Sequence, residues 1–532
     1  MRNYPLLLLA FICIVLITAS CKMKPRPPEA MKLPGNGDSI KAYIKAENEY
    51  SEKWLDHYDV LKNAISAELA GRRQSTEAPQ SRANDSIFES PDWKILVMNR
   101  NEVRLQPTGK NKQAGRVIYT EPDRAFRVSL RTSASLNFIF IESISESSSE
   151  ARLIPASLKS LKPLLLQERK KGVFYRADHF GGNNIWILSN ENAPRRCLII
   201  APVSSPGSEG WKAAVKENDS VFIDSYEVID EKFLAIVQRK HLGTSIEITS
   251  LYQEVKGPVI ENKINFPEPE GQISDFSYSE KDDKLVFTYS SIITPPTCYT
   301  YGIHSMHMGI RWKKQIKLYD QDNYKASVIT AVGNKGERVP VSLISKRDEE
   351  PLTRPKPLLL LIMPGEPWEY GKGFSPYLIS LLDRGVALAC VHVPLNNPSG
   401  EEGSQIINAA ASALIGKQIT SAGLITLVAR DPAAIPVVRS ACDHPEWFRA
   451  LTLESPRAAN ISCLRDIPFV CIYTDQNQLT GTERQPATVS EMRKLTKEGN
   501  TLLLISGDRR VKEENMMAGL LTFILAANGI NK

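Results

Sequence analysis

The chain has 532 residues, of which 42% are hydrophobic and 24% are charged, and its formal net charge at pH 7 is +6. This length corresponds to two or three domains of about 150 residues each. Acidic and basic residues are interspersed, and no basic stripe with interleaved aromatic residues is present, so no nucleic-acid partner is expected.

Residues 1–20 are typical of a secretory signal, with a short basic start, an apolar run and small residues before Cys21. The apolar run is shorter than the roughly 20 residues that a spanning helix needs. Cys21 directly after small residues resembles the bacterial lipobox, in which the cysteine is lipidated, although Thr18 departs from the usual leucine. We therefore expect a lipid-anchored protein of the bacterial cell envelope, most naturally of the outer membrane, with residues 21–38 as a tether. A plain cleaved signal with a chance cysteine is the alternative.

Eight cysteines are spread over the chain without CxxC or Cys–His spacing. Besides Cys13 and Cys21 they are Cys197, Cys298, Cys390, Cys442, Cys463 and Cys471. Most of these six lie in apolar runs that look like strands, so buried thiols are expected. A disulfide stays open as an alternative, because the sequence does not pair the cysteines.

The first half of the chain predicts a helical segment followed by an all-β domain. Residues 39–85 form the helical segment and its polar linker, because apolar residues recur at helical spacing after a capping residue, Asp38 or Ser39. In residues 86–318, short apolar runs alternate with turn signals, as in a β-sandwich or a β-propeller. This length holds about five blades at ~40–45 residues per blade, but no strict repeat decides between the two.

Residues 319–532 alternate predicted strands and helices. The eight predicted strands are residues 327–332, 339–345, 358–363, 386–393, 424–428, 450–454, 469–474 and 502–506. Several are continuous Val, Ile and Leu runs, which is typical of strands buried on both faces of a parallel sheet. The amphipathic segments between them are residues 376–384, 406–415, 432–442, 489–498 and 513–528. This order predicts an α/β-hydrolase domain, a mostly parallel eight-stranded sheet with helices on both faces.

Several segments resemble the prolyl oligopeptidase family of serine peptidases, and its oligopeptidase B branch most of all. The resemblance to the start of the peptidase domain rests on residues 338–344 (RVPVSLI), 357–361 (PLLLL), 381–385 (LLDRG) and His392. Residues 118–123, 186–190 and 289–297 resemble the family's propeller, and residues 43–50 its N-terminal helix. The resemblance implies a propeller joined to an α/β-hydrolase domain. Since the family's propeller has seven blades and sequence like the early blades is missing, it implies a shortened propeller.

The family's catalytic triad is not found at the positions that the resemblance implies. A serine hydrolase of this fold has its nucleophile in a Gly-x-Ser-x-Gly turn after a strand, followed along the chain by an acid and a histidine. Asp431 stands at the nucleophile position, without either glycine, and Gln478 stands at the acid position. Lys512 lies nearest the histidine position, in a loop predicted over residues 507–514. His444 is the last histidine in the chain, so no other alignment of that loop supplies the base.

Two other residues are candidates for a nucleophile. Ser421 lies in a Ser-Ala-Gly like that of the family, but it precedes the strand instead of following it. Asp431 could attack a substrate carbon to form an ester, but the second step of that route needs a histidine to activate water. We prefer the interpretation that Asp431 caps the helix that follows Pro432.

No cofactor and no metal site are expected. His304 and His307 lie three residues apart with methionines beside them, but no third ligand is evident. Two exposed loop histidines are the simpler interpretation.

The group that stabilises the oxyanion is also missing. Where the family has a tyrosine hydroxyl, this chain has Met363, or Pro364 if the alignment shifts by one. Without a triad, a contribution on the order of 10⁶-fold in kcat is lost. We therefore expect a non-catalytic protein that binds a peptide or a protein partner in the cleft between the two domains, and a lipid bilayer through Cys21. The alternatives are an active serine-type oligopeptidase with a rearranged site, another hydrolase chemistry, and a purely structural envelope component.

Overall fold

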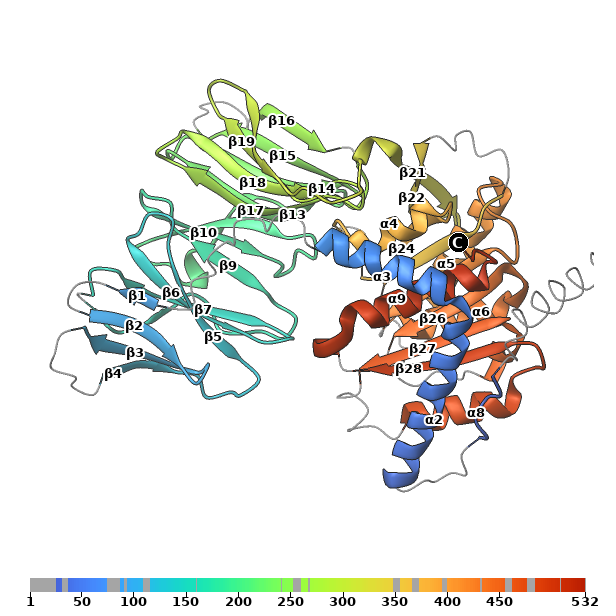
Figure 1. Cartoon of the computed structure of the whole chain (residues 1–532). Helices are drawn as coiled ribbons and strands as arrows, with labels where there is room; N and C mark the ends of the chain where they lie inside the picture. The colour runs from blue at the N-terminus through green and yellow to red at the C-terminus, as the bar shows by residue number, and fades with distance from the viewer. Residues whose placement is uncertain are drawn as a thin grey trace, which may run out of the picture. The chain divides into compact units, whose positions relative to one another are not determined.

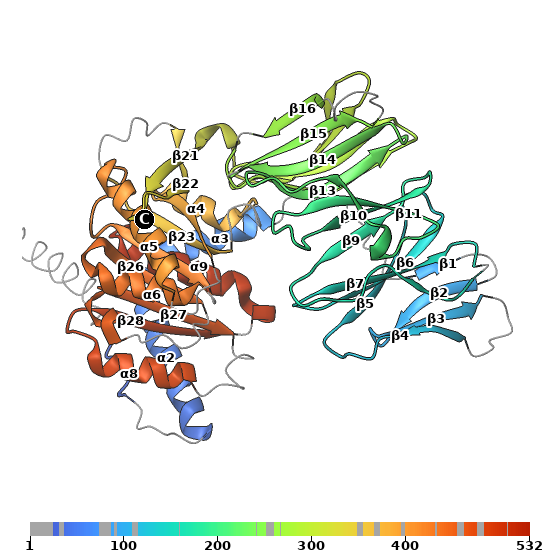
Figure 2. The ribbon, with the colours of Figure 1, turned by 180° about the vertical axis from the view of Figure 1, so that it is seen from behind.

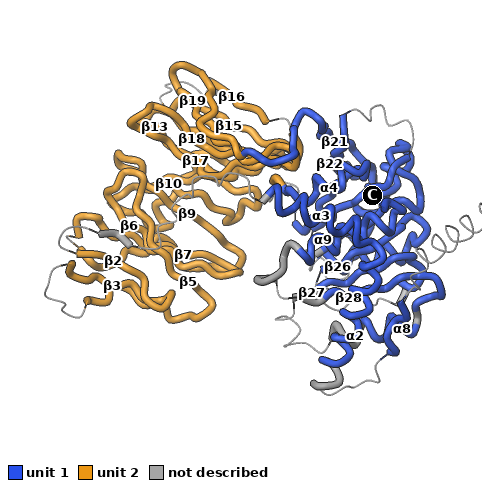
Figure 3. The backbone as a smooth tube through the Cα atoms, in the orientation of Figure 1, with its two compact units in different colours: residues 1–76, 315–367, 375–532 blue, residues 77–314, 368–374 orange. Residues whose placement is uncertain are grey.

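The computed structural model of the chain (Figure 1) divides into two compact units. It describes residues 25–30, 37–73, 87–89, 93–108, 115–158, 160–240, 242–251, 260–266, 268–347, 355–365, 373–394, 400–430, 433–454, 462–475, 484–507 and 509–531. Figure 3 shows the two units in different colours: the first comprises residues 1–76, 315–367 and 375–532, and the second residues 77–314 and 368–374.

The second unit consists, in its described residues, of five four-stranded antiparallel sheets. The strands are β1 (Ile87–Glu89), β2 (Trp93–Met98), β3 (Glu102–Pro107) and β4 (Arg116–Thr120) in the first sheet; β5 (Arg127–Thr132), β6 (Phe138–Ile144), β7 (Ser149–Pro155) and β8 (Leu164–Leu165) in the second; β9 (Tyr175–Asp178), β10 (Asn184–Ser189), β11 (Cys197–Pro202) and β12 (Lys212–Val215) in the third; β13 (Phe222–Ile229), β14 (Phe233–Lys240), β15 (Gly243–Ser250) and β16 (Ile260–Phe266) in the fourth; and β17 (Gln272–Ser279), β18 (Lys284–Ser290), β19 (Thr297–Gly302) and β20 (Met308–Lys313) in the fifth. In every sheet each strand pairs with the next one in sequence, so each sheet is a local meander.

The apolar core of this unit lies between neighbouring sheets. Ile95 and Val103 of the first sheet pack in one buried cluster with Ile139 and Ile141 of the second. Alternation of side chains along a strand produces such faces, because successive residues point to opposite sides of a sheet. These stacked meanders are the blades of a shortened β-propeller, as the family resemblance implies.

The five blades follow one another in chain order. The first strands of neighbouring blades meet, since β1 contacts β5 and β13 contacts β17. Figures 1 and 2 show the blades along an arc, with the sheet β1–β4 at one end and the sheet β17–β20 at the other. The unit is therefore an arc of blades with two separate ends.

The first unit is built around one eight-stranded sheet with the strand order β21-β22-β24-β23-β25-β26-β27-β28. The strands are β21 (Tyr324–Val332), β22 (Arg338–Lys346), β23 (Leu358–Pro364), β24 (Ala387–Val393), β25 (Ile425–Arg430), β26 (Phe448–Glu454), β27 (Phe469–Asp475) and β28 (Thr501–Gly507). The six strands from β24 to β28 in this order pair in parallel. β22 pairs antiparallel with both β21 and β24. All eight predicted strands are present, and the α/β-hydrolase fold is confirmed.

Helices cover both faces of this sheet. They are α4 (Pro376–Asp383), α5 (Glu401–Gly416), α6 (Ala434–Asp443), α8 (Arg484–Leu495) and α9 (Arg509–Ala527). Leu358 and Leu360 share a buried cluster with Ile407 of α5 and Val437 of α6. Leu359 points to the opposite face by strand alternation and is equally buried, and α4 and α9 contact the strands of the sheet as well.

Two further helices, α2 (Gly37–Leu55) and α3 (Asp59–Arg73), pack against the same sheet unit. The Trp54 ring lies 5.8 Å from that of Phe523 in α9, and the Ser51 hydroxyl donates a hydrogen bond of 2.8 Å to the Leu504 carbonyl in β28. These helices correspond to the segment predicted over residues 39–73. Within the described residues, no helix is both long and apolar enough to cross a bilayer.

The cysteines only partly follow the expectation of buried thiols. Cys197, Cys298, Cys390 and Cys471 are free, and the last three of these are buried. Cys442 is disulfide-bonded, so the expectation of a thiol is wrong there. Its position at the end of α6 gave no local signal for a disulfide. The side chain of Cys463 lies outside the described residues, as does Cys21.

Candidate functional site

The carboxyl ends of the parallel strands are where open α/β sheets place their functional residues. Strand β25 ends at Arg430, and α6 begins at Ala434, so Asp431 falls in the short turn between a strand and a helix. This is the fifth strand of the sheet in chain order, and its turn is where an α/β-hydrolase carries its nucleophile. Asp431 itself lies outside the described residues.

The helix does not begin where the capping role expected for Asp431 would place it. The N-cap residue of α6 is Ala433, with φ −71° and ψ −2°, and it makes no side-chain capping hydrogen bond. The helix begins two residues later than a start at Pro432 would require. Proline suits the first helical position but does not oblige a helix to begin there.

The other two triad positions follow β27 and β28. Strand β27 ends at Asp475, so Gln478 follows it, outside the described residues. Strand β28 ends at Gly507, and α9 begins at Arg509, so Lys512 lies in the first turns of a helix. The loop predicted over residues 507–514 is therefore wrong from residue 509 onward. The segment contains neither Gly nor Pro after Gly507, and its Arg, Lys and Glu residues favour a helix.

Met363 lies near the carboxyl end of β23, where the resemblance places the oxyanion donor. Its Cα partner in the parallel ladder is His392 of β24, which is buried. A thioether is at best a weak acceptor and has no proton to donate to an oxyanion. His392 does not replace the missing base: β23 separates β24 from β25, so the backbones of His392 and Arg430 are roughly 10 Å apart at two strand spacings.

The sequence did not single out a buried polar pair at the same edge. The Tyr473 hydroxyl donates a hydrogen bond of 2.6 Å to Oε2 of Glu454, and both side chains are buried. The two residues are Cα partners on β26 and β27, and Glu454 is also the partner of Arg430 on β25. Their only signal in the sequence was their place at the ends of two predicted strands.

The remaining sequence candidates lie elsewhere. Ser421 precedes β25, at the strand end opposite to the turn that carries Asp431. His304 is 67% exposed, with its Nε2 4.0 Å from a carboxylate oxygen of Asp283, and His307 is exposed too. In the described part of the chain, no group of three or more His, Cys, Asp or Glu side chains is arranged to hold a metal ion.

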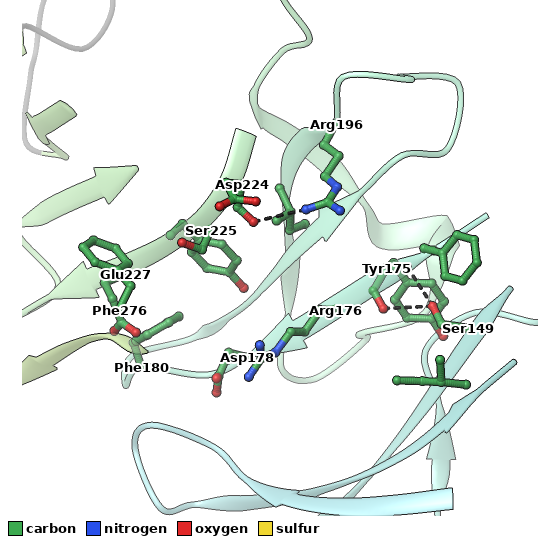
Figure 4. Close-up of a pocket in the computed structure, with 14 residues that line it drawn as sticks. Ser149, Tyr175, Arg176, Asp178, Phe180, Arg196, Asp224, Ser225, Glu227 and Phe276 are labelled. Atoms are coloured by element: carbon green, nitrogen blue, oxygen red, sulfur yellow. Dashed lines mark hydrogen bonds between the residues drawn. The ribbon is translucent and has the colours of Figure 1, made fainter. Parts of the chain in front are cut away.

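The second unit contains a pocket of about 320 Å³ on the inner strands of its blades (Figure 4). Arg176 and Asp178 come from β9, and Asp224 and Glu227 from β13. Aromatic rings complete the lining, among them Phe276 of β17. The pocket therefore combines charges of both signs from two consecutive blades.

The charged side chains around this pocket differ in how many hydrogen bonds they make. Arg131 donates hydrogen bonds to Oδ2 of Asp178 at 2.6 Å and to Oε1 of Glu142 at 3.0 and 3.1 Å. Burial, and after it the negative charge of Asp178, raise the pKa of Glu227 to about 8, against a smaller opposing effect of Arg176. Glu227 is thus largely protonated at neutral pH in the empty pocket.

The sheet unit has a more open pocket of about 400 Å³, lined by residues such as Gly423, Pro445 and Pro468. Gly423 lies two residues before β25 and Pro468 directly precedes β27, so this pocket lies at the amino ends of the strands. Ligands of open α/β sheets bind at the opposite edge, and we assign no function to this hollow.

Residues 96–309 match the family model described as the N-terminal β-propeller domain of prolyl oligopeptidase. The matched stretch begins within β2 and ends within β20, so it includes strands of all five blades. The second unit is thus similar to the propeller of the prolyl oligopeptidase family.

Curated relatives in this family match more than half of the chain at low identity. The dipeptidyl aminopeptidase BI of Pseudoxanthomonas mexicana is 26% identical over 311 residues, which are 58% of this chain and 41% of that protein. Protease 2 of Moraxella lacunata is 25% identical over 301 residues, 54% of this chain and 40% of that protein. The matches thus span less than half the length of either relative.

The fold of this prolyl oligopeptidase relative is also that of solved oligopeptidase B structures. The enzyme from Trypanosoma brucei, solved in a closed form with covalently bound antipain, has a TM-score of 0.73 to this chain at 16% identity. The superposition covers 96% of this chain and 97% of that one. At this identity the likeness shows the fold, so activity has to be argued from the residues.

Proposed function

We propose that this member of the prolyl oligopeptidase family binds peptides or a protein partner without cleaving them, as a lipid-anchored protein of the bacterial cell envelope. The observation that carries the proposal is that His444 is the last histidine of the chain. No residue after β28 can therefore serve as the imidazole base that a hydrolase of this fold takes from that position.

The other positions support the same conclusion. A carboxylate at the turn after β25 lacks the hydroxyl that forms an acyl-enzyme, and Gln478 is uncharged at the acid position. Asp431 as an alternative nucleophile would still need a base for the hydrolysis of its ester. Met363 contributes no proton to an oxyanion. A protein that keeps this fold but lacks these groups can still bind a peptide or a protein partner.

The location in the envelope has two supports. Cys21 stands directly after a signal-like segment and small residues. Cys442 is in a disulfide, and disulfides persist in oxidising compartments outside the cytosol. The protein would then be anchored to the lipid bilayer through Cys21, and we do not assign the membrane face.

The proposal is tested with a library of internally quenched peptides rich in Arg and Lys sites, incubated with the purified full chain at high concentration. We expect no turnover above the buffer rate, whereas an active member of the family should cleave the same library. Retention of library peptides by the chain after gel filtration would then identify ligands.

Asp431→Asn and Ser421→Ala serve as matched variants in the same assay. Turnover by the wild type that disappears in either variant would overturn the proposal and identify the nucleophile. Such a result would favour the alternative, a serine-type or aspartate-dependent peptidase with a rearranged site.

A further inference from the structure

One end of the pocket in the second unit is formed by a carboxylate among aromatic rings. Figure 4 shows Phe180, Glu227 and Phe276 together on one side, with Asp178 next to them. Tyr226 adds a third ring, with its centroid 5.7 Å from that of Phe180 in an edge-on arrangement. These groups come from three different blades, so only the folded unit brings them together.

The Glu227 side chain makes no hydrogen bond within the described part of the chain, although its neighbours do. Asp178 accepts one from Arg131, which also donates to Glu142. One guanidinium therefore pairs with two carboxylates, and an ionised carboxylate at the half-buried Glu227 would have no cation of its own. A buried charge without a partner is costly, and a ligand that brings the opposite charge removes that cost.

The two arginines that line the pocket do not supply this charge to Glu227. Arg196 donates to the Asp224 carbonyl at 3.1 Å and lies over the Phe222 ring at 4.6 Å. Arg176 is exposed to solvent, where water and salt weaken its effect. Its influence on Glu227 is accordingly smaller than that of Asp178.

We propose that this pocket binds a guanidinium or ammonium group, such as the side chain of an arginine or lysine in a peptide, between the carboxylates of Glu227 and Asp178 and the rings of Phe180, Tyr226 and Phe276. Aromatic faces and carboxylates together are the usual surroundings of a bound organic cation. The volume of about 320 Å³ suits one long side chain. The site lies in the propeller, so binding there does not depend on whether the other unit has a catalytic triad.

Binding of a cation at this pocket is linked to pH through Glu227. In the empty pocket its pKa is about 8, so below this value the carboxyl must release a proton before it can pair with the ligand. The affinity should therefore rise as the pH increases toward 8, by at most tenfold per pH unit, and level off above it. The charged groups that face Glu227 are Asp178, Arg176 and Arg131, and of these only the carboxylate of Asp178 favours a cation.

The test is isothermal titration calorimetry of the full chain with arginine amide at pH 6, 7, 8 and 9. Citrulline amide, which has the same shape and α-amine without the guanidinium charge, is the matched ligand. Lysine amide distinguishes an ammonium from a guanidinium preference. We expect arginine or lysine amide to bind at least tenfold more tightly than citrulline amide, with an affinity that rises from pH 6 to 8.

Glu227→Gln should weaken binding at pH 9 at least tenfold and abolish the dependence on pH, whereas Glu209→Gln, at an exposed glutamate away from the pocket, should bind as the wild type does. Asp178→Asn should weaken binding as well, and it replaces Glu227→Gln in the test if that variant does not fold. Equal binding of arginine and citrulline amides, or no binding of any of the three, would overturn the proposal. So would an affinity that falls as the pH rises, which would point to an anion held by Arg176.

Discussion

Glu121 and Glu227 show how neighbours set the charge of two carboxyl groups in the same unit. Burial opposes the ionisation of Glu121, but hydrogen bonds from Arg169, from the Asp123 amide and from Tyr119 outweigh it and lower its pKa to about 2. Glu227 has no such donors, and burial with the nearby charge of Asp178 raises its pKa to about 8. The first group is therefore a structural anion, and the second is a neutral acid at pH 7 until a cation reaches it.

Glu121→Gln should lower the free energy of unfolding at pH 7 by about 2 kcal/mol. This is less than the cost of breaking a fully buried pair, because Arg169 is 26% exposed and keeps its ion pair with Glu150. The pKa of Glu121 is depressed on folding, so its contribution is present above about pH 4.5 and is lost as the pH falls toward 2. Midpoints of urea unfolding at pH 7 and pH 3 measure the difference, with the exposed Glu146→Gln as control. An equal loss at both pH values would contradict this account.

Glu227→Gln should have the opposite dependence on pH. Its pKa is raised on folding from 4.5 to about 8, so between these values the folded chain binds a proton that the unfolded chain lacks. The contribution of Glu227 to the free energy of unfolding is thus greatest below pH 4.5 and falls by up to about 1.4 kcal/mol per pH unit as the pH rises toward 8. Because the amide cannot ionise, the denaturation midpoint of the variant should rise relative to that of the wild type between pH 5 and 9. A constant difference over this range would show that Glu227 is not the group that titrates.

The N-terminal helix α2 is attached to the sheet unit through a buried ion pair. Arg493 of α8 donates from Nε and Nη2 to the two carboxylate oxygens of Glu47 at 3.0 and 2.5 Å, and the exposed fractions of the two side chains are 5% and 0%. The Tyr43 hydroxyl adds a hydrogen bond of 2.5 Å to Oε1 of Glu47, and the guanidinium lies over the Tyr50 ring. The sequence predicted the helix that carries Tyr43 and Tyr50, but Arg493 lies more than 440 residues away and nothing in the sequence connects it to them.

Arg493→Met should release α2 from this contact. It leaves the Glu47 carboxylate buried without its cation, which costs about 3–5 kcal/mol. Hydrogen exchange in residues 43–55 should therefore quicken while that of β25 and β26 stays slow. The double variant with Glu47→Leu removes both charges and should restore most of the protection. If the single and double variants exchange alike, the pair does not hold the helix.

At the scale of the whole molecule, a five-bladed arc and an eight-stranded sheet are joined in one chain. The first and last blades lie at the two ends of the arc, so each blade is stabilised by its sequence neighbours. The proposed location of the chain in the envelope belongs to this scale too, because an oxidising compartment favours the disulfide of Cys442.

Cys21→Ala should move the chain from the membrane fraction to the soluble fraction of cells that produce it. If Cys21 carries the anchoring lipid, its removal leaves no apolar group of comparable length in the mature chain. Metabolic labelling with a fatty-acid analogue, followed by fractionation, measures both lipid and location, with Cys298→Ala as the matched cysteine variant. An unlabelled wild type in the soluble fraction would favour the plain cleaved signal, and unchanged membrane attachment of Cys21→Ala would show that another group anchors the chain.

The sequence by itself determined the eight strands of the sheet, the all-β character of the preceding unit and the lack of a histidine after His444, because burial patterns and residue identity are local properties. Only the tertiary structure decided that the β unit is an arc of blades and not a sandwich, and that Cys442 is in a disulfide. It also placed Asp178, Glu227 and Phe276 around one pocket. Contacts between blades join residues about 50 apart in the chain, and no spacing in the sequence encodes such pairs. The pKa of Glu227 likewise depends on neighbours that only the folded chain supplies.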